Sequence, residues 1–66
     1  MIGSKIKEYL DKNGIKQTFV AEKTGISVSN LSAMLNRGRT INAVDYYKIC
    51  KVLNVPLDMF LEGCDQ

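Results

Sequence analysis

The chain has 66 residues, of which 45% are apolar and 24% are charged, and its formal net charge at pH 7 is +2. This length predicts one small domain over residues 1–66. Because a domain of this size buries only about 60% of the surface that its unfolded chain exposes, its core must be simple. The longest apolar run is a few residues, far short of the roughly 20 that a transmembrane helix needs. With no such span and no apolar leader, the chain is expected to be cytoplasmic.

The residue types that catalysis and metal binding need are scarce. There is no histidine, so a serine nucleophile would have no histidine base. Two cysteines, Cys50 and Cys64, do not make a four-ligand zinc site, and no glycine-rich phosphate loop or paired carboxylate cluster is visible. Cys50 is expected in the core and Cys64 as an exposed, reduced thiol. We therefore expect a non-enzyme with no cofactor, no metal and no small-molecule substrate.

Charge is distributed unevenly along the chain. Residues 1–40 carry seven basic and three acidic side chains, whereas residues 41–66 carry two basic and four acidic ones. A basic half orients a domain towards a polyanion such as nucleic acid. A surplus of positive charge this small also occurs in proteins that bind no nucleic acid. Charge alone therefore does not decide whether this chain binds nucleic acid.

The first predicted helix covers about residues 3–13 and lies over the core as a lid. Its apolar residues, from Ile2 to Leu10, recur at helical spacing. The pair Asn13-Gly14 then gives a strong stop signal.

Two short helices, at about residues 17–24 and 28–35, follow with a tight turn between them. Ala21 is small enough to let the second helix cross the first closely, and Gly25 falls where the chain must turn sharply with a positive φ. Ser27 is a good N-cap for the second helix. Apolar and small residues on both sides of the turn then share one core: Val20, Thr24, Ile26, Leu31 and Met34.

The fourth predicted helix opens at Asn42 and continues to about Leu53. Asn42 is its N-cap, and Asp45 lies in its first turn, where a negative charge is favourable. Asn54 then suits a left-handed C-cap. Four residues form its inner stripe: Tyr46, Ile49, Cys50 and Leu53.

A short fifth helix is predicted over residues 57–61. Pro56 blocks continuation of the helix before it, and Phe60 would close the bottom of the core. No segment alternates like a strand over more than a few positions. The expected fold is therefore all-α, a five-helix orthogonal bundle that contains a helix-turn-helix.

Residues 17–36 resemble the helix-turn-helix of the phage repressor and Cro family, also called xenobiotic-response-element-like regulators. The resemblance rests on the spacing of Gln17, Ala21, Gly25 and Leu31, and it extends through the loop at residues 36–40 to the later apolar positions. It implies a lambda-repressor-like DNA-binding domain. The function it implies is a sequence-specific regulator of transcription, a repressor or Cro-like protein of a phage or mobile element, that binds double-stranded DNA.

The resemblance also implies which residues contact DNA. The helix from Val28 would enter the major groove, with the motif held in shape by Ala21, Gly25, Ile26 and Leu31. Base edges would be read by Val28, Ser29, Ser32 and Ala33. The DNA backbone would be contacted by Gln17, Asn30, Asn36, Arg37, Arg39 and Thr40, and more weakly by Lys16 and Lys23.

Other interpretations of these residues stay open. Gln17 also suits an exposed helix start, Asn36 a helix C-cap, and Arg37 and Arg39 solvated loop charges. Phe19 stands where the family usually has a polar residue, so it either packs on a neighbouring helix or anchors a partner. The alternative function is accordingly a protein-interaction module, or an antitoxin-like partner-binding domain, on the same fold.

Helix-turn-helix domains of this kind usually bind palindromic operators as two-fold dimers. No segment of the sequence resembles an added oligomerisation domain, so a homodimer is expected to use the domain itself. The residues predicted for this surface are Met59, Leu61 and Cys64.

Overall fold

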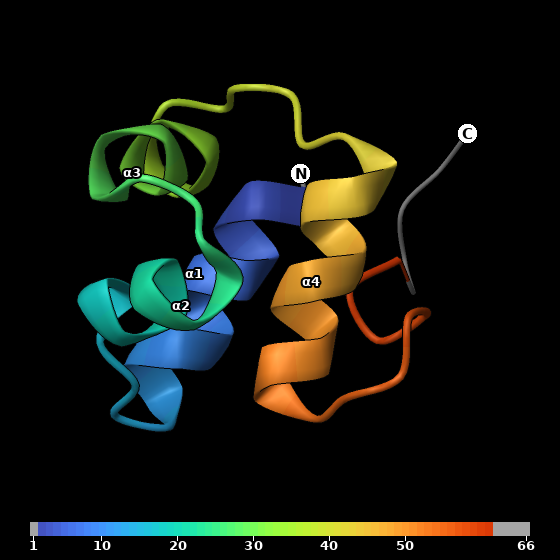
Figure 1. The fold of residues 1–66 in the computed structure, drawn as a ribbon. Helices are drawn as coiled ribbons and strands as arrows, with labels where there is room; N and C mark the ends of the chain where they lie inside the picture. Colours follow the sequence, from blue (N-terminus) through green and yellow to red (C-terminus); the bar gives the residue numbers. More distant parts are fainter. Residues whose placement is uncertain (1, 62–66) are drawn as a thin grey trace.

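The computed structural model describes residues 2–61, and in this range it contains four helices (Figure 1). These are α1 (Ile2–Lys12), α2 (Gln17–Thr24), α3 (Val28–Asn36) and α4 (Ala43–Leu53). Helix α1 packs on α3, while α2 packs on both α3 and α4. The described range contains no strand, and none of its helices is long and apolar enough to cross a membrane. The predicted all-α class is confirmed.

The predicted fifth helix is not present at residues 57–61, which form turns instead. The Met59 amide donates to the Pro56 carbonyl at 3.1 Å, and the Leu61 amide donates to the Asp58 carbonyl at 3.2 Å. Both bonds span three residues and not four, so they close single turns. One helical turn offers too few internal hydrogen bonds to offset the cost of ordering its backbone, which explains why this five-residue segment after a proline does not form a helix.

The core contains side chains from all four helices and from Phe60 in the segment after α4. Thr24 is its one buried polar residue among those described, and its hydroxyl donates to the Val20 carbonyl at 2.8 Å. Ile26, predicted in the core, is half-buried and packs against it. The buried apolar side chains of the core are Ile6, Leu10, Val20, Ala21, Leu31, Met34, Leu35, Ile49, Cys50 and Phe60.

An aromatic cluster ties the segment after α4 to the rest of the fold. The buried Phe60 ring meets Tyr9 of α1 edge to face at 5.6 Å and Tyr46 of α4 at 6.5 Å. The Tyr46 hydroxyl donates to the Leu57 carbonyl, and burial raises the pKa of Tyr46 to about 12. Phe60 therefore closes the core as predicted, although no helix carries it.

Cys50 is a free, buried thiol on α4, as the sequence predicts, and burial raises its pKa. A raised pKa leaves little reactive thiolate at neutral pH, which fits a packing residue. Cys64 lies outside the described residues.

Helices α1 and α3 approach closely at Gly3, which is buried. A Cβ atom on residue 3 would lie 2.1 Å from the Met34 carbonyl oxygen and 3.2 Å from the carbonyl carbon. Both are backbone atoms of α3, so they cannot rotate away as a side chain could. Gly3 therefore sets the distance between α1 and the C-terminal half of α3.

Candidate nucleic-acid interface

A three-residue connection, residues 25–27, joins α2 to α3 and fixes the angle between them. Gly25 adopts φ 79°, and its amide donates to the Ala21 carbonyl at 2.9 Å. The Thr24 hydroxyl accepts from the Ile26 amide at 3.3 Å. A residue with a Cβ rarely adopts this φ, so glycine suits the position, as predicted. Ala21, buried at 3% exposure, lies within the core as the close crossing requires.

Helix α3 begins with the predicted cap, since the Ser27 side chain accepts a hydrogen bond from the Asn30 amide at 3.1 Å. Its outer face carries Val28, which is 50% exposed, and the exposed Ser29. Ser32 and Ala33, further along that side, are half-buried. The opposite face is buried through Leu31, Met34 and Leu35. Helix α3 is thus held by one face while its other face stays open.

The loop after α3 folds back against the end of that helix. Gly38 takes φ 70°, and the amides of Arg37 and Arg39 both donate to the Ala33 carbonyl, at 3.0 and 3.2 Å. The Arg39 guanidinium then donates to the Asn30 side-chain oxygen at 2.8 Å. These bonds hold the backbone of both arginines, and the side chain of Arg39, beside α3.

A further hydrogen bond lies along α3 itself, where the Asn36 side-chain amide donates to the Ser32 hydroxyl at 3.1 Å. The Ser32 oxygen accepts in this bond, so its own proton is still available for another acceptor. The structure thus brings together four polar residues predicted to touch DNA in two pairs, Asn30 with Arg39 and Ser32 with Asn36.

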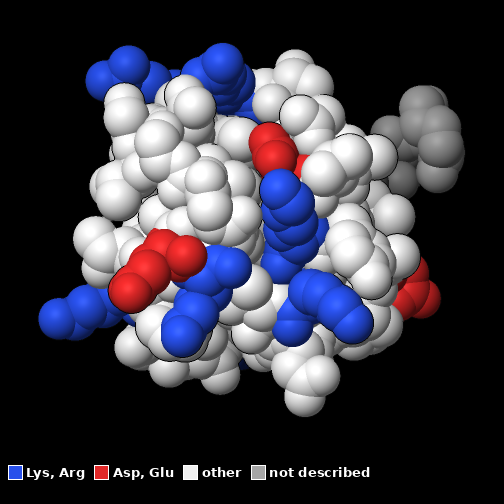
Figure 2. Space-filling model, in the orientation of Figure 1, with Lys and Arg blue, Asp and Glu red and all other residues white. Residues whose placement is uncertain are grey.

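Helix α3 is uncharged, and the loop that follows it carries two arginines, Arg37 and Arg39, which we call the basic rim. No charged residue lies between Val28 and Asn36, whereas Arg37 and Arg39 follow immediately. Figure 2 shows basic side chains at the edge of the molecule where this loop runs, and an uncharged surface over α3. A surface of this kind can approach a polyanion through its rim without an acidic side chain at its centre.

A family model with the description "Helix-turn-helix" matches residues 6–60, which is most of the chain. The chain belongs to the phage repressor and Cro type of the helix-turn-helix family. This is a family of DNA-binding proteins, not an enzyme family, and it indicates a DNA-binding regulator of transcription. Comparisons with curated proteins and with solved structures find no match.

The remaining predicted contact residues of this helix-turn-helix protein lie at different places. Gln17 is half-buried at the start of α2, and the exposed Lys16 before it makes no side-chain cap. Thr40 borders a hollow between the loop and α1 that Gly3 and Met34 also line. Lys23 is separate from the others, because it lines a groove between α2 and α4.

Two contacts of the helix-turn-helix region were not anticipated from the sequence. The Ser32 and Asn36 pair lies four residues apart on one helix, a spacing from which it could have been found. The Asn30 and Arg39 pair is nine residues apart across a loop, and no local pattern indicates it.

Proposed function

We propose that the protein is a single-domain, sequence-specific regulator of transcription, a repressor or Cro-like protein, that places α3 in the major groove of double-stranded DNA. The observation that carries this proposal is the two-sided character of α3. Leu31, Met34 and Leu35 fix the helix to the core, while Val28 and Ser29 stand on an open, uncharged face. In a helix-turn-helix, the residues at the start of the second helix face base edges.

The reading side chains are short, which determines the kind of recognition. Neither serine nor valine nor alanine can make the bidentate contacts worth roughly 1–3 kcal/mol each. We assign Val28 and Ala33 to apolar contact with thymine methyl groups, and Ser29 and Ser32 to single hydrogen bonds. Much of the specificity would then come from the shape and deformability of the DNA.

The phosphate contacts are assigned to the basic rim and to the start of α2. The hydrogen bond from Arg39 to Asn30 holds that guanidinium in place before DNA arrives, which lowers the ordering cost of a phosphate contact. The first amides of α2, at Gln17, have no partner inside their own helix and can meet a phosphate. The full proposed set is Lys16, Gln17, Asn30, Asn36, Arg37, Arg39 and Thr40, with Lys23 as the most distant member.

Fluorescence anisotropy on a random-sequence duplex tests DNA binding. We expect affinity to fall steeply with salt, with a log–log slope near −0.9 for each phosphate neutralised. Arg37→Ala should weaken binding to all sequences alike, by roughly 5- to 10-fold, and reduce the slope by about one. Lys12→Ala, which removes a charge from the end of α1, serves as the control. Salt-independent binding, or no binding at low salt, would rule out the function.

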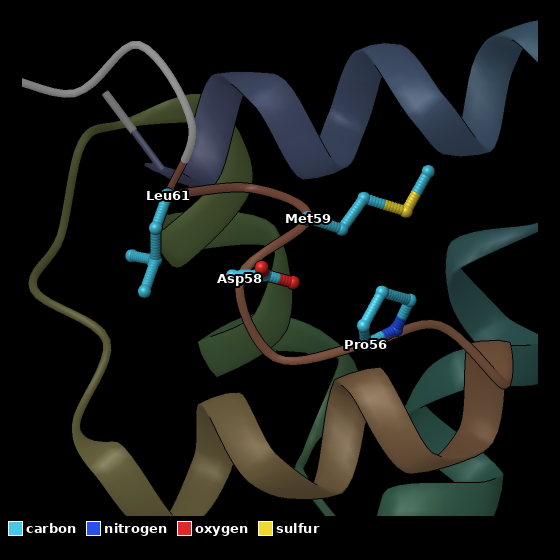
Figure 3. A pocket seen from close by; sticks show the side chains of 4 residues that line it. All are labelled: Pro56, Asp58, Met59 and Leu61. Carbon is cyan, nitrogen blue, oxygen red and sulfur yellow. The ribbon is translucent and has the colours of Figure 1, made fainter.

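We also propose a homodimer on a palindromic operator, formed through the segment after α4. Leu57, Met59 and Leu61 are all exposed there, and exposed apolar side chains that lie close together mark interaction sites. Pro56, Asp58, Met59 and Leu61 line a hollow of about 520 Å³. In Figure 3 the side chains of Met59 and Leu61 point in different directions from the segment. A second copy would cover these side chains.

Sedimentation at micromolar concentration, with and without a palindromic duplex, tests the dimer. The wild type should sediment as a dimer at least on the duplex, and Leu61→Lys should shift it to a monomer because a buried ammonium has no partner in an apolar interface. Val44→Lys, which changes an exposed apolar residue of α4, should leave the dimer intact. A wild type that is monomeric in both states would exclude this interface.

A further inference from the structure

A second surface lies between α2 and α4. It is a groove of about 400 Å³ lined by Lys23, Thr24, Tyr47, Lys48, Lys51 and Val52. All of these residues belong to α2 or α4, so the groove is distinct from the open face of α3 and from the loop after it. Figure 2 shows basic side chains gathered over the lower part of α4 and the neighbouring end of α2.

Exposed aromatic rings accompany the lysines of this groove. Phe19 is 46% and Tyr47 is 50% exposed. The Lys23 ammonium nitrogen lies 5.8 Å from the centre of the Phe19 ring, and the Lys51 nitrogen lies 6.0 Å from the centre of the Tyr47 ring. Each ring is therefore solvent-exposed and has a cation close to it. Apolar surface rimmed by charge marks interaction sites on soluble proteins.

The charges around the groove are mostly positive. Among the described lining residues there are three lysines and no carboxylate. Glu22 precedes Lys23, and Asp45 lies one helical turn before Lys48, but neither carboxylate lines the groove. An incoming carboxylate would thus meet three ammonium groups and no lining carboxylate, which favours an acidic partner.

We infer that this groove binds an acidic, partly apolar peptide segment of another protein. Asp and Glu side chains would pair with Lys48 and Lys51, while apolar side chains would cover the rings of Phe19 and Tyr47. A DNA backbone would satisfy the lysines but offer the rings no apolar partner, so the aromatic residues favour a peptide. The groove shares one residue, Lys23, with the proposed DNA-contact set, of which it is the most distant member. Lys48 and Lys51 are not in that set, so this inference does not depend on the DNA-binding function.

Selection from a random-peptide display library on the wild-type protein tests the groove. We expect the enriched peptides to interleave Asp or Glu with Leu, Ile or Phe. The double variant Lys48→Glu, Lys51→Glu should bind a selected peptide at least tenfold more weakly, because two attractive charges become repulsive. The double variant Lys7→Glu, Lys12→Glu carries the same charge change on α1 and should stay within about twofold of the wild type.

Several results would overturn the inference. The selection could give no enrichment above the uncoated support, or it could enrich peptides that lack acidic residues. The selected peptide could also bind the variant Lys48→Glu, Lys51→Glu as tightly as it binds the wild type. A loss of duplex DNA affinity in the groove variant as large as that of Arg37→Ala would make the groove a DNA contact. If the wild type self-associates and this variant does not, the groove would be a contact between two copies of the chain. Thermal melting verifies folding, and Lys48→Gln, Lys51→Gln replaces the reversal variant if that one is unfolded.

Discussion

Gly3→Ala is expected to destabilise the protein by roughly 2 kcal/mol, although alanine is normally the better helix residue by about 1 kcal/mol. The added methyl would lie 2.1 Å from the Met34 carbonyl oxygen, so α1 must move away from α3 or its first turn must unwind. In a domain of this size the loss corresponds to a fall in melting temperature of about 8–16 °C. Thermal unfolding followed by circular dichroism measures it.

The matched control is Glu8→Ala on the same helix, at an exposed position, which should change stability by no more than about 0.5 kcal/mol. Because Gly3 touches the half of α3 that contains Met34, its substitution should also weaken DNA binding by displacing the helix. A Gly3→Ala variant that melts at or above the wild-type temperature would show that the two helices are not in contact at this point.

The helices of the motif could be predicted from the sequence because each one is defined by local signals. Gly25 and Ser27 fix the turn and the start of α3 through backbone geometry and a cap that involve only nearby residues. Asn42 and Asn54 do the same for α4: Asn42 accepts from the Asp45 amide at 2.8 Å, and Asn54 has φ 58°. Capping and left-handed backbone are short-range effects, so a single sequence is enough to locate them.

The parts that could not be predicted depend on residues far apart in the chain. The close approach at Gly3 involves Met34, which lies 31 positions later in the chain. Arg39 reaches the Asn30 side chain only because the loop between them folds back towards α3. An isolated glycine in a helical pattern can signal such packing, but it does not say against which element. The turns at residues 57–61 show the opposite error: this mostly apolar segment suggests a helix but is too short to form one.

The sharpest prediction for the interface is Ser29→Glu, which should reduce duplex DNA affinity about 100-fold without harming the fold. Ser29 is the second residue of α3, where a carboxylate interacts favourably with the helix dipole by roughly 0.3–1 kcal/mol. The melting temperature should therefore stay the same or rise. At the DNA, the same charge would stand between two phosphate backbones, and like charges brought together cost several kcal/mol. Stability and DNA affinity should thus change in opposite directions.

Lys12→Gln provides the charge-matched control, since it also lowers the net charge by one but lies at the far end of α1. Its effect on DNA affinity should be no more than about twofold at 0.15 M salt, where charges further than about 8 Å apart are largely screened. If Ser29→Glu and Lys12→Gln weaken binding equally, the start of α3 does not face DNA. In that case only the long-range charge of the domain attracts the duplex, and the groove-reading role of α3 fails.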